Sequence, residues 1–122
     1  MRYEEVIDYL KSYQELKYNI EFYRTKMSGL KAISYSQEEK GVVLDNLMTE
    51  YMAKIEQTEK KMKEIEEFIE NNFQGKERLC IWNRYINNDT YKQIGAEIYY
   101  TSSYARKFIT NAIYKYLETI NK

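Results

Sequence analysis

The sequence predicts an all-α protein, in which a long antiparallel helical hairpin of the coiled-coil type is followed by three shorter helices. Proline is absent from the 122 residues and glycine occurs only four times, whereas strands and tight hairpins need more turn residues. Two apolar stripes with heptad spacing occupy the first part of the chain, and short aromatic-rich segments follow them. We therefore expect a hairpin for oligomerisation or partner binding at 1–74 and a second helical domain at 75–122.

The first predicted helix carries apolar residues alternately three and four positions apart, which is the spacing of a coiled-coil seam. These residues are Val6, Tyr9, Tyr13, Leu16, Ile20, Tyr23, Met27 and Leu30. The segment "SGLKAISYS" (28–36) interrupts the pattern, so we expect the helix to end near Gly29. Ser36 and Glu39 match a capping box, which predicts that the second helix begins there. Its stripe consists of Leu44, Met48, Tyr51, Ile55, Thr58, Met62, Ile65 and Ile69.

Further apolar positions broaden both stripes beyond what two paired helices cover. They are Leu10, Phe22, Leu47 and Phe68. This breadth predicts packing against the C-terminal part or against a second copy of the chain, and we expect a homodimer formed through the hairpin. The residues predicted to mediate oligomerisation or partner binding are Leu16, Ile20, Tyr23, Met48, Tyr51, Ile55, Met62 and Ile65.

The C-terminal region begins after "NNFQGKE" (71–77), where Gly75 suits the left-handed conformation that often follows a helix. Helices are predicted at 76–86, 91–100 and 102–120. Thr90 and Gln93 match a capping box at the start of the second of these, and Thr101 precedes the third.

The last two segments have the spacing of a helix-turn-helix, in which a short helix, a tight turn and a second helix with an exposed start follow one another. Gly95 and Ala96 supply small side chains where the two helices would cross. The apolar residues expected to lock that crossing are Ile94, Ile98, Ala105 and Phe108.

Residues 76–120, including "LCIWNRYINNDTYKQIG", resemble region 4 of sigma-70-type RNA polymerase sigma factors. The combination with a helical N-terminal segment is similar to phage-encoded regulators of late transcription (the RinA/ArpU type) and to short sigma-like proteins of prophages. The resemblance implies a DNA-binding transcription regulator whose partners are duplex DNA and RNA polymerase. The residues predicted to contact DNA are Ser102, Ser103, Tyr104, Arg106, Lys107, Thr110 and Asn111.

Two positions depart from the sigma pattern. Tyr99 occupies a turn position often held by Gly, Asn or Asp, and a bulky side chain resists a positive φ. Ser102 and Ser103 stand where sigma factors carry Arg and Glu, so promoter specificity does not transfer.

The charge distribution fits a C-terminal contact with a polyanion. The chain is neutral overall, but residues 1–75 hold 15 acidic and 11 basic residues, whereas residues 76–122 hold 4 acidic and 8 basic ones. Histidine is absent, Cys80 is the single cysteine and no Gly-rich phosphate loop is present. We therefore expect no catalytic residues, no cofactor and no metal site, and we expect Cys80 to be a buried core residue.

The charged N-terminus "MRYEEVIDYLK" and the lack of a long apolar run predict a cytoplasmic protein with no signal peptide and no membrane partner. Two alternatives to DNA binding remain open on the sequence alone. One is a protein-interaction module, such as a phage-encoded inhibitor or adaptor of a host protein, with the helix-turn-helix as a scaffold. The other is a small terminase subunit.

Overall fold

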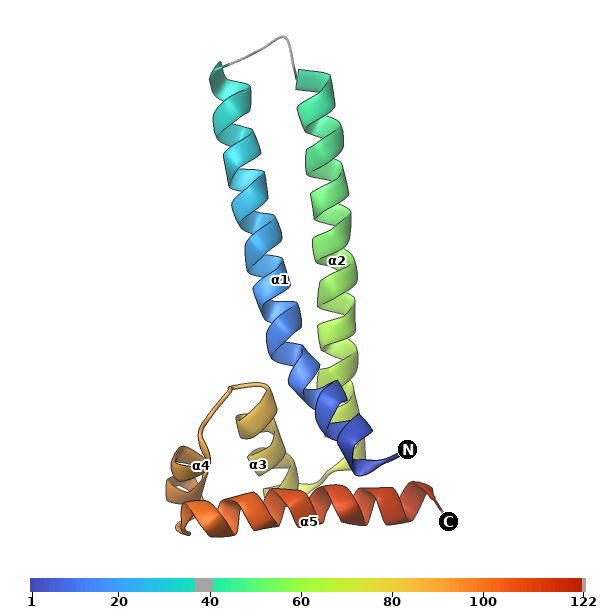
Figure 1. The fold of residues 1–122 in the computed structure, drawn as a ribbon, viewed down its shortest axis with the longest axis vertical. Helices are drawn as coiled ribbons and strands as arrows, with labels where there is room; N and C mark the ends of the chain where they lie inside the picture. Colours follow the sequence, from blue (N-terminus) through green and yellow to red (C-terminus); the bar gives the residue numbers. More distant parts are fainter. Residues whose placement is uncertain (37–40, 122) are drawn as a thin grey trace. The chain divides into compact units, whose positions relative to one another are not determined.

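The computed structural model describes the backbone of residues 1–36 and 41–121, and it is helical almost throughout (Figure 1). Its helices are α1 (Tyr3–Ser36), α2 (Gly41–Asn72), α3 (Gly75–Tyr85), α4 (Tyr91–Glu97) and α5 (Ser102–Ile120). No strand occurs among the described residues, so the predicted all-α class is confirmed.

Helix α1 is longer than the sequence predicted, because it continues through Gly29 to Ser36. A glycine inside a helix costs only about 1 kcal/mol relative to alanine. With no proline in the segment, that penalty is too small to end a helix. The predicted capping box at Ser36 and Glu39 lies partly outside the described residues, and α2 is helical from Gly41 onward.

The residues group into two compact units. One contains residues 15–63, and the other contains residues 1–14 together with 64–122. The units do not coincide with the predicted boundary between residues 74 and 75, because the first turns of α1 and the end of α2 group with α3, α4 and α5.

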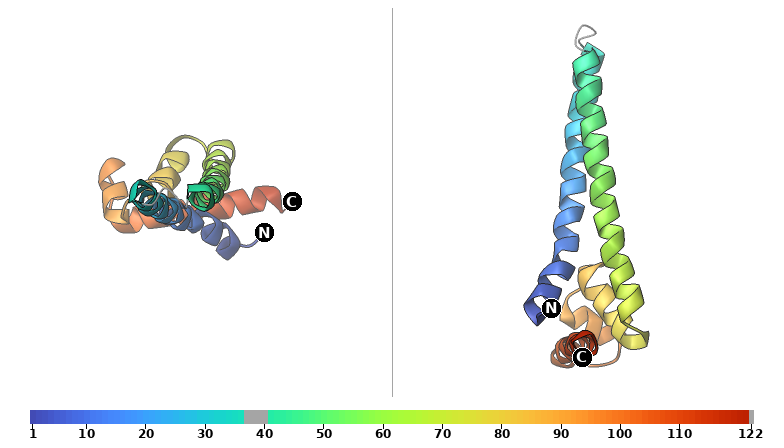
Figure 2. Two further views of the ribbon diagram at one scale, coloured as in Figure 1. Left: turned by 90° about the horizontal axis from the view of Figure 1, so that it is seen from above. Right: turned by 90° about the vertical axis from the view of Figure 1, so that its right-hand side faces the viewer.

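Within the unit at 15–63, α1 and α2 run side by side as the predicted hairpin (Figures 1 and 2). The rings of Tyr23 and Tyr51 lie 6.0 Å apart between centroids. The Nζ atom of Lys54 lies over both rings, at 5.7 and 5.6 Å. Arg24 and Glu59 form an ion pair at 3.4 Å, but both side chains are exposed, so the pair contributes at most about 1 kcal/mol.

The core of the other unit joins the start of α1 to the end of α2 and to the C-terminal helices. Its largest fully buried side chains are Val6, Leu10, Ile65, Ile69, Cys80, Ile81, Ile94, Ile109 and Ile113. The ring of Phe68 packs edge-on against both Tyr9 and Tyr116, with centroids 5.3 Å apart in each pair. Cys80 is buried as predicted, and this burial raises the pKa of its thiol. Segments from the beginning and the end of the chain thus share one core.

Helix α3 begins after a change in chain direction at Gly75, whose φ of 59° confirms the predicted left-handed conformation. The chain then turns through Asn88, which also has a positive φ, and enters α4 at Thr90. The capping box predicted there is confirmed: Gln93 N donates to Thr90 Oγ1 at 3.2 Å, and Thr90 N donates to Gln93 Oε1 at 2.8 Å.

The backbone of the connection between α4 and α5 passes close to Gly95. A Cβ atom on Gly95 would lie 2.7 Å from the carbonyl oxygen of Tyr100 and 2.8 Å from that of Thr101. Tyr100 N donates to Gly95 O at 2.7 Å across the same contact. Gly95 therefore supplies the small side chain expected here. The same expectation is wrong for Ala96, which is exposed to solvent.

The connection between α4 and α5 contains Tyr99 in the left-handed conformation, with φ 63°. The bulky side chain therefore does not prevent a positive φ at this position. It is 94% exposed, so no packing compensates the backbone strain. An L-residue in this region costs roughly 1–2 kcal/mol.

Replacing Tyr99 by glycine is expected to stabilise the protein by about 0.5–1 kcal/mol. The change removes the steric penalty of the left-handed conformation but adds freedom to the unfolded chain, which offsets part of the gain. Urea unfolding followed by circular dichroism measures the difference. Tyr99→Ala is the matched control, since it keeps Cβ and should leave stability near that of the wild type. Equal unfolding curves for Tyr99→Gly and Tyr99→Ala would contradict the strain at this position.

Candidate nucleic-acid interface

Two features position helix α5, namely the capping residue at its N-terminus and the apolar face that it buries. Thr101 caps it, with Tyr104 N donating to Thr101 Oγ1 at 3.1 Å. The buried residues of α5 recur at helical spacing and turn one side of the helix into the core. They are Ala105, Ile109, Ala112, Ile113 and Leu117. The opposite side of α5 is consequently left at the surface.

The residues predicted to contact DNA all lie on α5 away from its buried face. Six of them are exposed, namely Ser102, Ser103, Tyr104, Arg106, Lys107 and Asn111. Thr110 is half-buried, and its hydroxyl donates to the carbonyl oxygen of Arg106 at 2.9 Å.

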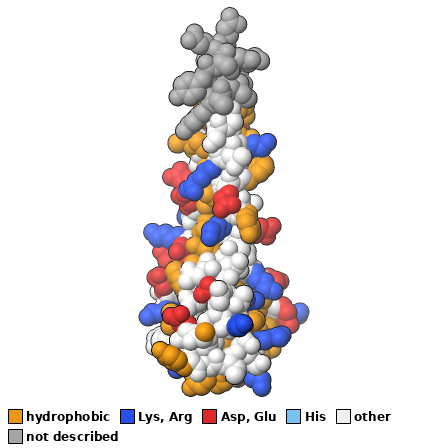
Figure 3. Space-filling view, turned by 90° about the vertical axis from the view of Figure 1, so that its left-hand side faces the viewer, with side chains coloured by type: hydrophobic (Ala, Val, Ile, Leu, Met, Phe, Trp, Pro, Cys, Tyr) orange, Lys and Arg blue, Asp and Glu red, His pale blue; other side chains and the backbone are white. Residues whose placement is uncertain are grey.

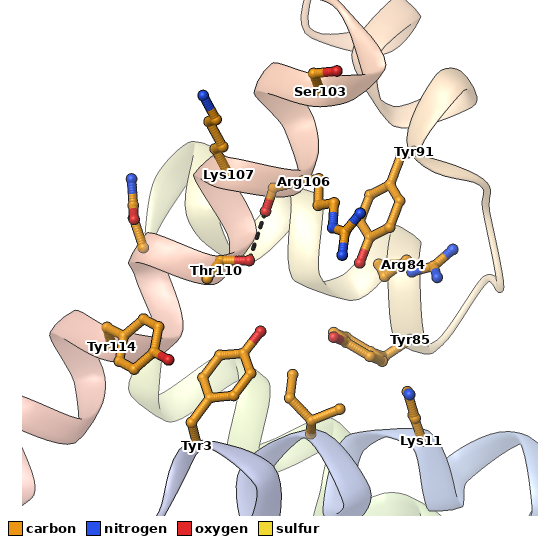
Figure 4. Close-up of a pocket in the computed structure, with 12 residues that line it drawn as sticks. Tyr3, Lys11, Arg84, Tyr85, Tyr91, Ser103, Arg106, Lys107, Thr110 and Tyr114 are labelled. Carbon is orange, nitrogen blue, oxygen red and sulfur yellow. Dashed lines mark hydrogen bonds between the residues drawn. The ribbon is translucent and has the colours of Figure 1, made fainter.

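Five of these seven residues line one open groove of about 900 Å³ (Figure 4). They are Ser103, Arg106, Lys107, Thr110 and Asn111. Tyr104 points elsewhere: its ring stacks on Tyr100, with centroids 4.1 Å apart. The structure therefore divides the predicted set into five residues that line one groove and two, Ser102 and Tyr104, that do not.

The remaining walls of the groove come from three other helices and from the middle of α5. The start of α1 contributes Tyr3, Ile7 and Lys11, the end of α3 contributes Arg84 and Tyr85, α4 contributes Tyr91, and α5 adds Tyr114. In Figure 4 the ring of Tyr3 and the guanidinium of Arg106 reach into the space between α1 and α5. Sequence reasoning missed these residues of α1, because they are roughly 100 positions from the α5 residues of the groove and lie outside the heptad stripe of the predicted hairpin.

The groove is cationic. Its lining includes Lys11, Arg84, Arg106 and Lys107, and no Asp or Glu is among the described residues that form it. Within the described part of the chain, Arg106 and Lys107 form no ion pair. Their charges are therefore available to an anionic ligand.

Arg84 is held in place by neighbouring groups. Its guanidinium carbon lies 4.0 Å from the centroid of the Tyr91 ring, and its Nη1 donates to the carbonyl oxygen of Asp89 at 3.0 Å. A guanidinium has five N–H donors, so this arrangement fixes the group while most of its donors remain for another partner. The sequence around Arg84, an arginine shortly before a polar turn, did not predict that its guanidinium stacks on the Tyr91 ring.

Tyr85 forms the floor of the groove beside Arg84. Burial raises the pKa of its phenol well above the ordinary value, and the neighbouring phenols of Tyr91 and Tyr3 raise it further, against an opposing effect of Arg84. The hydroxyl is therefore protonated at neutral pH and able to donate a hydrogen bond.

A second surface of the same unit is aromatic. Tyr100, Tyr104 and Phe108 stack in series, and the Nζ atom of Lys76 lies 5.5 Å from the Tyr100 ring centroid. Figure 3 shows hydrophobic side chains gathered at the lower end of the face that it presents, with Lys and Arg side chains beside them. This aromatic row was not foreseen as a feature separate from the DNA-contacting residues.

The residues predicted to mediate oligomerisation are partly or wholly buried within the chain. Ile20 and Ile65 are buried, with 7% and 1% of their surfaces exposed. The other six are half-buried, namely Leu16, Tyr23, Met48, Tyr51, Ile55 and Met62. Among the side chains of the 15–63 unit that the structure describes (15–30 and 45–63), the more exposed large apolar ones are Tyr18, Phe22, Leu47 and Met52. Dimerisation through the predicted residues stays a prediction.

No cluster of three or more metal-ligating side chains occurs in the described part of the chain. Among the described helices, none is both long and apolar enough to cross a membrane. Comparisons of the chain with protein-family models, with curated proteins and with solved structures found no match.

Proposed function

We propose that α4, the connection at 98–101 and α5 form a helix-turn-helix, and that the protein is a DNA-binding transcription regulator that reads duplex DNA with α5. Three features support the helix-turn-helix. Helix α4 has only seven residues, the connection contains a residue with positive φ, and Tyr100 N in that connection donates a hydrogen bond to Gly95 O of α4 at 2.7 Å. Short tight turns of this kind are typical of the motif.

The observation that carries the proposal is the chemistry of the exposed side of α5. Arg106 and Lys107 are exposed, form no ion pair with any described residue and lie beside hydroxyl and amide groups. Arginine and lysine bind guanine O6 and N7 or phosphate, asparagine pairs with adenine, and serine and threonine bind either. The exposed side of α5 thus presents groups that suit contacts with both the phosphates and the bases of DNA.

Because the chain carries no net charge, a single copy makes few phosphate contacts and binds DNA weakly. A homodimer formed through the hairpin, or attachment to RNA polymerase, would raise the effective affinity by making the second contact intramolecular. The sigma-like C-terminal region and the helical N-terminal segment together support a role as a phage or prophage regulator.

A second candidate is a protein-interaction module whose helix-turn-helix serves as a scaffold. The aromatic row of Tyr100, Tyr104 and Phe108 favours it, because stacked rings at a surface suit an interface with another protein. Under this alternative the cationic side of α5 has no role, and duplex DNA does not bind.

Fluorescence anisotropy with a labelled duplex separates the two candidates. We expect the full chain to bind even an arbitrary duplex with a Kd of roughly 10⁻⁴–10⁻⁶ M near physiological salt. The logarithm of the affinity should fall linearly with the logarithm of the salt concentration, with a slope of about −3 if three or four phosphates are neutralised. No binding at about 50 mM salt, or binding that does not change with salt, would overturn the DNA-binding proposal.

A further inference from the structure

On the basis of that function, we propose that the groove between the start of α1 and α5 seats the sugar–phosphate backbone of one DNA strand, with Lys11 of α1 contacting a phosphate. The DNA interface then includes α1, and a DNA strand that lies beside α5 is contacted by α1 on the opposite side. No feature of the helix-turn-helix alone requires this contact.

The charges of the groove fit a polyanion. Residues with cationic side chains line it from three separate helices, namely Lys11 from α1, Arg84 from α3 and the pair Arg106 and Lys107 from α5. The acidic residues of the first turns of α1 are exposed but do not line it; they are Glu4, Glu5 and Asp8. Among the described residues of α1, the charge that lines the groove is therefore positive.

The wall formed by α1 is held at both ends of the groove. Gln14 Nε2 donates to the carbonyl oxygens of Tyr85 and Ile86, at 2.9 and 3.0 Å, which ties α1 to the end of α3. At the other end the rings of Tyr3 and Tyr114 stack, with centroids 4.6 Å apart and planes inclined by 14°. Lys11 lies between these two anchors in the chain, so the backbone that carries it is held in place beside α5.

The groove also contains a neutral donor and a further guanidinium. Tyr85 and Arg84 both line it, and Arg84 uses one N–H for the carbonyl oxygen of Asp89, so most of its donors are not taken by that bond. Tyrosine hydroxyls and cationic side chains bind phosphate oxygens. At about 900 Å³ the groove is at the upper end of the sizes found for ligand sites, so space does not limit a strand.

The test compares duplex binding by the wild type, Lys11→Ala and Lys17→Ala over a series of salt concentrations. Both lysines are exposed on α1, but Lys17 does not line the groove, so Lys17→Ala is the matched control. We expect Lys11→Ala to weaken binding and to reduce the magnitude of the salt slope by about 0.9, which corresponds to one phosphate that is no longer neutralised. Lys17→Ala should reproduce the wild-type slope.

Three outcomes would overturn the proposal, and they differ in what they say about the function. If the wild type binds duplex and Lys11→Ala has an unchanged slope, the groove assignment fails and DNA binding stands. If the wild type does not bind duplex, both fail. If a poly-glutamate peptide binds as tightly as duplex and depends equally on Lys11, the groove accepts acidic protein segments and the strand assignment is wrong.

Discussion

The double substitution Arg106→Ala and Lys107→Ala is expected to raise the Kd for duplex DNA at least about 30-fold. Both side chains are exposed on the outer side of α5 and form no ion pair within the described chain, so their removal costs little folding stability. Removing one interaction with a guanine edge or a phosphate costs roughly 1 kcal/mol or more, and two such removals correspond to the stated factor.

The matched control for this prediction is Lys60→Ala with Lys61→Ala. These lysines are exposed on α2 in the 15–63 unit, and their removal changes the net charge by the same amount. We expect the control to bind duplex like the wild type in the same anisotropy titration. Equal weakening in both variants would mean that the net charge of the chain governs binding, and α5 would lose its assigned role.

Replacing Gly95 by alanine is expected to lower the free energy of unfolding by about 1–3 kcal/mol, which is typical of an overpacked contact. The new Cβ would lie 2.7 Å from Tyr100 O and 2.8 Å from Thr101 O, and backbone atoms at the start of α5 cannot move aside as a flexible side chain does. The better helix propensity of alanine offsets up to about 1 kcal/mol of this destabilisation.

Gly29→Ala provides the control, because nothing lies within 4 Å of the position that its Cβ would take in α1. This change should leave stability the same or raise it by up to about 1 kcal/mol. Urea unfolding followed by circular dichroism measures both variants. Trp82 is the single tryptophan and lies in α3, so its fluorescence reports on the unit that contains Gly95. A Gly95→Ala protein as stable as the wild type would contradict the close approach of Gly95 to the backbone of Tyr100 and Thr101.

Short sequence patterns correctly predicted those features of the fold that are determined by residues close together in the chain. The capping box of Thr90 and Gln93, the left-handed Gly75 and the bounds of α5 at Ser102–Ile120 all depend on side chains within a few positions of one another. The two heptad stripes indicated the hairpin for the same reason, since their spacing is a property of one helix at a time.

Three features of the structure were not predicted from these local signals. The end of α1 was placed too early, because the weak penalty at Gly29 was given the effect of a helix stop. The groove was missed, because Lys11 and Tyr3 carry no signal that they lie opposite Arg106. Tyr99 shows a third limit: the turn imposes a positive φ on a residue that disfavours it, so the surrounding structure overrides the local preference.

The central claim is that the outer side of α5 meets duplex DNA, and nuclear magnetic resonance tests it most directly. Two-dimensional amide spectra of the full chain are recorded while a short duplex is added at low salt. We predict that the largest shift changes fall on Ser103, Arg106, Lys107, Thr110 and Asn111, with smaller changes along residues 15–63. Changes confined to the hairpin at 15–63, or none at saturating duplex, would contradict the account.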